Sequence, residues 1–218
     1  MRKLRRKDRP SGDLVPSLAL AYALFALTFR GDRARFWNRM TFAGLTLGSL
    51  ALWREPKLRE LRPTGGDLAA GASSAAGLYA IFRVGDVLAR KIMPAGAENI
   101  GDIYELRNLE PHARIAARLA AVIGPAEELF WRGFVQARLA ERLGDTRGAA
   151  AASAVYGGAH LVTGNPTLLG AATMAGAYWG GLARLGMSME ALIASHLIWD
   201  ITIFLVAPTQ NGRAEVPQ

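Results

Sequence analysis

Long stretches without Asp, Glu, Lys or Arg alternate with short charged segments along this 218-residue chain. The uncharged stretches are residues 14–29, 40–53, 68–82 and 148–183. The helices of a soluble protein usually carry a polar face, which would interrupt such stretches with charged side chains. No alternating strand pattern of useful length is present. The pattern therefore predicts an all-α fold whose helices lie in a membrane.

The predicted fold is a multi-pass transmembrane helical bundle of about seven spans. Several uncharged runs are nearer 15 residues than the roughly 20 that a spanning helix needs. Flanking arginines and interfacial tryptophans can extend their reach. We expect the fourth helix to break near Gly124-Pro125 and a tight turn at residues 163–166. The expected spans are 14–30, 38–54, 67–90, 113–143, 147–162, 167–185 and 188–207.

The net charge of +8 and the isoelectric point of about 10.4 raise the question of a nucleic-acid partner. The basic residues cluster between apolar runs, and no basic stripe with interleaved aromatics is present, so no nucleic-acid partner is expected. Basic loops beside apolar runs fit the anionic head groups of a lipid bilayer instead. The densest basic cluster precedes the first apolar run, which by the positive-inside rule places the N-terminus in the cytoplasm.

The head of the chain has the basic and apolar regions of a signal peptide. No Ala-x-Ala cleavage site follows residues 14–29, so we expect a retained first span. The expected location is therefore the cell membrane, as a multi-pass protein. The chain contains no cysteine, which excludes thiol catalysis and disulfide bonds.

Three short motifs place ionisable side chains in apolar segments, where a membrane makes them costly. The first is Glu127-Glu128-Leu129-Phe130-Trp131-Arg132. Glu128 and Arg132 are four residues apart and can pair on one helix face, whereas Glu127 points about 100° away. An unpaired carboxylate among apolar side chains suits a general base. The alternative is that both glutamates only cap a helix that starts after Pro125.

The other two motifs each contain one histidine. In Tyr156-Gly157-Gly158-Ala159-His160 the polar residues share a helix face, and the glycines allow another backbone or a substrate to approach. In His196-Leu197-Ile198-Trp199-Asp200 the polar pair is again four residues apart. Such a pair can fix an imidazole tautomer, assist proton transfer or hold a metal. The alternative for His160 is a core side chain whose hydrogen bonds are satisfied. The alternative for His196 and Asp200 is a buried hydrogen-bonded pair that joins two helices.

The order of the motifs resembles the CPBP family of intramembrane proteases, which includes the Ras-converting CAAX endopeptidases and the bacterial Abi proteins. The family pattern is Glu-Glu-x-x-x-Arg, then Phe-x-x-x-His, then His-x-x-x-Asn or a similar residue. Tyr156 replaces the phenylalanine, and an aspartate replaces the asparagine of the eukaryotic enzymes. The resemblance covers about residues 113–205. The matching residues are Glu127, Glu128, Arg132, His160, His196 and Asp200.

The resemblance implies an intramembrane endopeptidase in which Glu127 is the general base on water and His160 helps to position and deprotonate that water. His196, with the side chain at position 200, would stabilise the oxyanion. Glu128 and Arg132 would hold the geometry. An ionised Asp200 would repel an oxyanion, so we expect it either to be protonated or to orient His196, and we favour the second role.

Three alternatives remain open. A zinc protease could use Glu127, His160 and His196 as ligands, but no His-Glu-x-x-His motif is present, and we expect no cofactor. A non-enzymatic membrane protein, such as a bacteriocin-immunity factor or a partner-binding scaffold, would use the polar residues as helix glue. A proton-coupled transporter would also use intramembrane Glu, His and Asp, but no inverted repeat is visible.

We predict one membrane domain in three parts. Residues 1–112 form scaffold spans, residues 113–207 form the CPBP-like catalytic core, and residues 208–218 form a frayed polar tail. The expected partner is a membrane-anchored protein or peptide substrate. Nothing in the chain indicates a prenyl-binding groove, so a membrane-anchored peptide or a C-terminal tail is favoured over a prenylated substrate.

Overall fold

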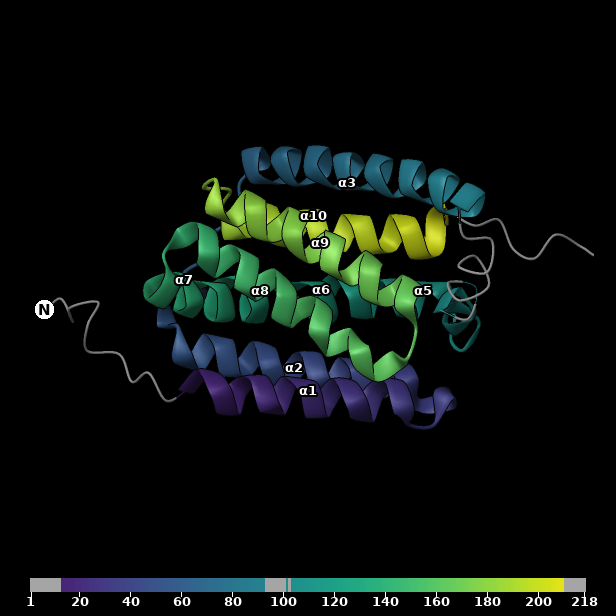
Figure 1. The fold of residues 1–218 in the computed structure, drawn as a ribbon, viewed down its shortest axis with the longest axis horizontal. Helices are drawn as coiled ribbons and strands as arrows, with labels where there is room; N and C mark the ends of the chain where they lie inside the picture. Colours follow the sequence, from purple (N-terminus) through teal and green to yellow (C-terminus); the bar gives the residue numbers. More distant parts are fainter. Residues whose placement is uncertain (1–12, 93–100, 102, 210–218) are drawn as a thin grey trace, which may run out of the picture.

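The structure, a computed structural model of the chain, describes residues 13–92, 101 and 103–209. These residues form seven helical rods and contain no strand, so the all-α prediction is confirmed for them. Successive rods run in alternating directions between two ends of the molecule (Figure 1). The helices outside the fourth rod are α1 (Leu14–Arg30), α2 (Phe36–Arg54), α3 (Gly65–Ile92), α8 (Asp145–Ala159), α9 (Pro166–Arg184) and α10 (Met189–Ile201).

The fourth rod remains helical from His112 to Leu143, so the predicted break at Gly124-Pro125 is wrong. Proline lacks an N–H and its ring crowds the preceding helical turn. Here the widened turn of a π-helix comes directly before Gly124-Pro125 and accommodates this ring without ending the helix. The segments of this rod are α5 (His112–Arg118), π-helix η6 (Leu119–Ile123), α6 (Gly124–Glu128), π-helix η7 (Leu129–Gln136) and α7 (Ala137–Leu143).

Short connections set the ends of the later helices. The predicted turn at residues 163–166 is confirmed, because Gly164 takes a left-handed conformation with φ of 66°. Asn165 then caps α9, and its side chain accepts a hydrogen bond from the amide of Leu168. A 3-10 helix, η8 (His160–Thr163), extends α8, and a π-helix, η9 (Thr202–Val206), extends α10.

Small residues bring α8 and α9 into close contact. A Cβ atom on Gly157 would lie 2.1 Å from the Thr173 hydroxyl, and one on Gly176 would lie 2.8 Å from the Tyr156 ring. Gly157 and Gly176 therefore make room for the chain's own side chains, as expected for helix packing in a bundle. On the other side of the molecule, α10 packs against α3 and α6.

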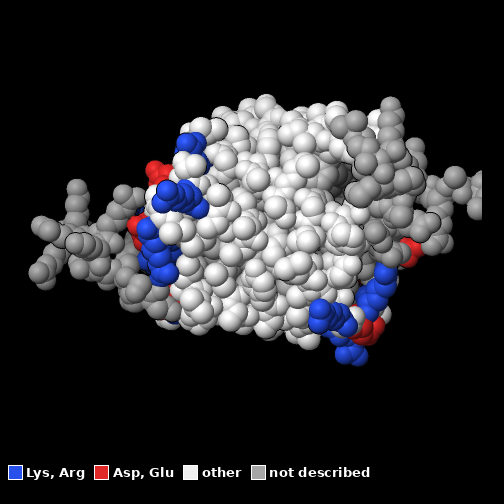
Figure 2. All heavy atoms as spheres, viewed as in Figure 1, with Lys and Arg blue, Asp and Glu red and all other residues white. Residues whose placement is uncertain are grey.

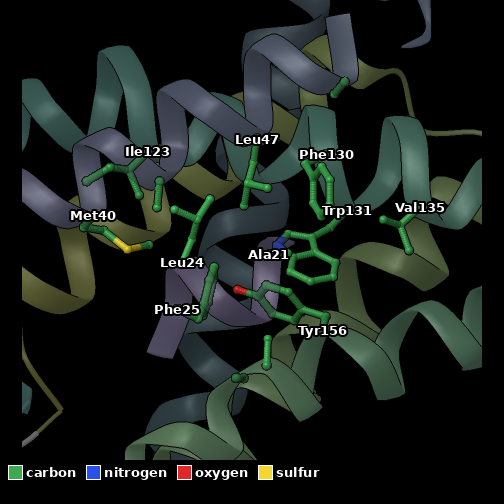
Figure 3. Close-up of a cluster of buried hydrophobic side chains, with 14 of the residues drawn as sticks. Ala21, Leu24, Phe25, Met40, Leu47, Ile123, Phe130, Trp131, Val135 and Tyr156 are labelled. Carbon is green, nitrogen blue, oxygen red and sulfur yellow. The ribbon is translucent and has the colours of Figure 1, made fainter. Parts of the chain in front are cut away.

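The main hydrophobic cluster joins α1, α2 and the fourth rod to α8. Its fully buried rings include Phe25, Phe130 and Trp131, and Tyr156 lies beside Trp131 within it (Figure 3). A smaller cluster around Leu78 and Trp179 joins α3, α9 and α10. Among the motif residues, Tyr156 belongs to the main cluster, and His196 stacks on Trp179 of the smaller one.

The multi-pass prediction is not confirmed by the helices of the described residues. Among the described residues, one helix, Met189–Val206, is long and apolar enough to cross a membrane by length and composition, and α1 is a shorter apolar helix. On the face of the molecule in Figure 2, the charged side chains gather near the two ends and leave a broad uncharged surface between them. The basic N-terminal segment 1–12 and most of the predicted tail, residues 210–218, lie outside the described residues.

Candidate active site

Glu128 is the central contact of the site. Its side chain is fully buried on α6, and its Oε1 atom accepts a hydrogen bond from Arg132 Nη1 at 2.9 Å. The same Oε1 atom lies 2.7 Å from His196 Nδ1 on α10. The predicted pairing of Glu128 with Arg132 is therefore present. The contact with His196 joins α6 to α10 and could not be predicted from spacing along one helix.

The pair is not fully satisfied within the protein. Glu128 Oε2 and Arg132 Nη2 are both buried and lack hydrogen-bond partners among the described residues. The Arg132 guanidinium lies over two aromatic rings, 4.7 Å from the Tyr156 ring centroid and 5.3 Å from that of Trp179. Cation–π contacts of this kind stabilise a desolvated guanidinium.

Glu127 points away from Glu128, toward α8. The Tyr156 hydroxyl donates a hydrogen bond to Glu127 Oε2 at 2.9 Å, and Glu127 is 8% exposed. Glu127 is not a helix cap, because the chain is already helical before Gly124. The two glutamates therefore have different partners on different helices, as their orientation on the helix predicts.

His160 begins η8, and aromatic rings surround it. Its Nδ1 atom lies 3.1 Å from the backbone carbonyl oxygen of Tyr156. Its ring makes edge contacts with Phe25 at 5.3 Å and with Tyr156 at 5.2 Å between centroids, and Phe29 is 6.0 Å away. Since Phe25 and Phe29 lie on α1, the first helix packs directly against His160.

His196 lies between two carboxylates. Nδ1 faces Glu128, and Nε2 lies 3.5 Å from Asp200 Oδ2. Asp200 thus contacts His196, as predicted, but the shorter contact belongs to Glu128. The side chain of Asp200 is 15% exposed, compared with 3% for His196 and 0% for Glu128.

Trp179 is a contact of the site that the sequence analysis missed. Its ring stacks on His196 at 4.0 Å between centroids with an angle of 18° between the planes. Its Nε1 atom donates to Ser195 Oγ at 3.0 Å, and Ser195 Oγ donates to Ser74 Oγ on α3 at 2.9 Å. The only available signal was a large aromatic residue in the small-residue stretch of α9, and that signal does not identify its partner.

Among the described residues, no group of three or more His, Cys, Asp or Glu side chains could hold a metal ion. Glu127, His160 and His196, the ligands of the zinc alternative, therefore do not form a ligand set in this arrangement. His160 nevertheless has an acceptor at Nδ1, the Tyr156 backbone carbonyl oxygen, of the kind that a metal-ligating histidine usually has.

Fold and site together define a helical-bundle protein with a buried glutamate–histidine centre. Residues 111–202, from the residue before α5 to the start of η9, match the Rce1-like family, described as type II CAAX prenyl endopeptidase Rce1-like. This match confirms the resemblance to the CAAX-protease family and spans all six candidate residues. It supports a CAAX-protease-type endopeptidase in general, a membrane-embedded class of hydrolase that acts on membrane-associated proteins. No curated protein and no solved structure matches the chain.

Proposed function

We propose that this protein is an intramembrane endopeptidase that hydrolyses a peptide bond of a membrane-associated protein or peptide. The observation that carries the proposal is the burial of Glu127, Glu128, Arg132, His160 and His196 in one helical bundle. Burying so many ionisable groups is costly, and functional sites are where proteins usually retain them. The match of residues 111–202 to a peptidase family supports the same assignment.

Glu127 and His160 activate the attacking water in this mechanism. His160 donates its Nδ1 proton to the Tyr156 carbonyl oxygen, which leaves the lone pair of Nε2 available to orient a water molecule. Glu127 takes a proton from that water as the oxygen attacks the scissile carbonyl carbon. The same carboxyl group then gives the proton to the leaving amine when the tetrahedral intermediate collapses.

His196 stabilises the oxyanion of the tetrahedral intermediate in the same mechanism. Glu128 and Arg132 hold the imidazole through the contact at Nδ1. Because Nδ1 faces Glu128, Nε2 is the nitrogen that donates to the oxyanion. Asp200, 3.5 Å from Nε2, acts by orienting the imidazole and makes no contact of its own with the oxyanion, which an ionised carboxylate would repel. Truncating a single oxyanion donor typically costs about 100- to 1000-fold in kcat.

We propose that the rods cross the membrane together, with the uncharged surface of Figure 2 facing lipid. The exposed side chains between the charged ends support this proposal, because large apolar side chains face outward on three of the helices. A soluble protein rarely exposes a contiguous apolar surface of this kind. The exposed residues on these three helices are Val15, Leu20 and Leu27 on α1, Phe42, Leu45 and Trp53 on α2, and Leu68, Ile81, Val84 and Val87 on α3, and Met174 on α9 is exposed as well.

The decisive experiment replaces Glu127 with glutamine. The amide is nearly isosteric with the carboxylate and its oxygen can still accept the Tyr156 hydrogen bond, but it cannot take a proton from water. We expect cleavage to stop while the protein stays folded. The C-termini of the membrane proteome should differ between cells that carry the wild-type protein and cells that carry Glu127→Gln. Wild-type turnover by purified Glu127→Gln protein would show that the proposed mechanism is wrong.

The substrate class is tested with two matched fluorogenic peptides. Both carry the same CAAX sequence. One carries a prenyl group on its cysteine, and the other is anchored by an acyl group and carries no prenyl group. We propose that a membrane-anchored peptide is sufficient, so an acylated peptide without a prenyl group should be cleaved. Cleavage of the prenylated peptide alone would assign the narrower activity named by the family.

A further inference from the structure

The Tyr156 residue contacts both members of the water-activating pair. Its hydroxyl donates to Glu127 Oε2 at 2.9 Å, and its backbone carbonyl oxygen lies 3.1 Å from His160 Nδ1. One residue of α8 therefore connects the glutamate on α6 with the histidine that begins η8. This bridge depends on the phenol, because the phenylalanine of the CPBP pattern has no hydroxyl.

The phenol ring of Tyr156 is held on several sides. Trp131 meets it edge to face at 5.3 Å between centroids, and the Arg132 guanidinium lies 4.7 Å from its centroid. Gly176 leaves the space that the ring occupies, since a Cβ there would lie 2.8 Å from Tyr156 Cδ1. Because the buried ring cannot swing away, its hydroxyl is directed at Glu127.

We propose that the Tyr156 hydroxyl is a positioning group that fixes the Glu127 carboxylate for catalysis. Among the described residues, Tyr156 provides the hydrogen bond to this carboxylate, and it does so at Oε2. The bond locks the rotation of the carboxylate and leaves Oε1 as the oxygen that takes the proton from water. A general base needs this fixed geometry before its basicity matters. The inference rests on the proposed endopeptidase activity.

The test compares two tyrosine-to-phenylalanine variants in the purified full-length protein, assayed in lipid vesicles with the fluorogenic acylated peptide described above. If that peptide is not cleaved, the farnesylated CAAX peptide takes its place. Tyr156→Phe keeps the ring and the backbone carbonyl but removes the hydroxyl. Tyr79→Phe removes a hydroxyl that donates to the Ala207 carbonyl oxygen, between α3 and the end of η9. Both variants lose one hydrogen bond, but only the first loses a bond to the proposed base.

We expect Tyr156→Phe to lower kcat roughly tenfold with KM unchanged, the size expected for one hydrogen bond to a charged group. Tyr79→Phe should leave both constants unchanged. Glu127→Asp shortens the side chain by one methylene and should draw the carboxylate away from the phenol, so in this background Tyr156→Phe should have little further effect. Such non-additivity is expected when two residues act through one contact.

Three results would overturn the inference. The first is a wild-type kcat for Tyr156→Phe together with an inactive Glu127→Gln. This result would reject the role of the hydroxyl and would still agree with the proposed endopeptidase mechanism. The second is a kcat per folded molecule that is unchanged while thermal stability falls, which assigns a structural role to the hydroxyl. The third is full activity of Glu127→Gln, which removes the proposed mechanism and the inference with it.

Discussion

At the scale of single residues, Glu128 is the group on which most contacts of the site depend. One oxygen of this fully buried carboxylate faces both Arg132 and His196. A buried ion pair contributes little net stability compared with an apolar pair, but removing one partner leaves an uncompensated charge in the core. Glu128 therefore affects stability and geometry together, whereas Glu127 has no cationic partner among its described contacts.

Glu128→Gln should accordingly destabilise the protein, because Arg132 loses its charge partner in an apolar setting. We expect the free energy of unfolding to fall by about 3–5 kcal/mol. Thermal unfolding of the purified variants in the same detergent measures this effect. Glu127→Gln is the matched control and should unfold near the wild-type temperature. Equal unfolding temperatures for Glu128→Gln and the wild type would contradict the role assigned to Glu128.

The choice between glutamate and zinc catalysis also belongs to the residue scale. We predict that the purified active protein keeps its activity without metal, because Glu127 is the proposed general base and Glu128 contacts both Arg132 and His196. Metal analysis followed by chelator titration with add-back tests this prediction. Stoichiometric zinc, with activity lost on its removal and restored by zinc alone, would overturn it.

Contacts within one helix were predictable, and contacts between helices were not. The spacing of four residues correctly paired Glu128 with Arg132 and brought His196 near Asp200. The Tyr156–Glu127, His196–Glu128 and Trp179–His196 contacts each join different helices. They depend on how each helix is rotated about its axis. Because these helices are apolar on most faces, the sequence does not show which face packs inward.

At the scale of secondary-structure elements, the apolar runs predicted the helices well, because charged residues, prolines and glycines mark the ends. α1 has the predicted bounds, Leu14–Arg30, and the other ends differ by a few residues. The error at Gly124-Pro125 has a physical cause. A π-helical turn changes the register of the hydrogen bonds, and single-residue propensities do not reveal it.

Close helix packing gives a prediction at this scale. A Cβ on Gly148, at the corner between α7 and α8, would lie 2.4 Å from Ala140 Cα, and backbone atoms there cannot move aside. Gly148→Ala should therefore destabilise the protein although alanine favours a helix. Gly181→Ala on α9 is the control, because nothing lies within 4 Å of its Cβ position. It should stabilise the protein by up to about 1 kcal/mol, and thermal unfolding compares the two. An unfolding temperature for Gly148→Ala as high as that of Gly181→Ala would show that the corner is looser than described.

At the scale of the whole molecule, charge gathers at the ends of the bundle. Ion pairs support this arrangement at both ends: Arg54 pairs with Asp13 at 2.6 Å at one end, and Arg118 pairs with Glu110 at 3.0 Å at the other. The buried pair between Arg138 and Glu55, at 2.8 Å, ties α7 to the segment that follows α2. In the proposed membrane arrangement these polar ends face lipid head groups, and the uncharged surface on the face shown in Figure 2 lies between them.

The alternating rods lead to a topology prediction. The described chain starts at one end of the bundle and finishes at the other, and the connection between α2 and α3 lies at the starting end (Figure 1). The basic cluster within residues 1–9 favours a cytoplasmic starting end. Reporter fusions in the 54–66 connection should therefore report the cytoplasm, and a fusion after Gln218 should report the opposite side.

The topology does not depend on catalysis. The reporters can therefore be fused to the Glu127→Gln variant if cleavage by the wild-type protein harms the cells. If both fusions report the same side, the rods do not all cross the membrane, and the fourth, with its charged residues and its two π-helical stretches, is the first to re-examine.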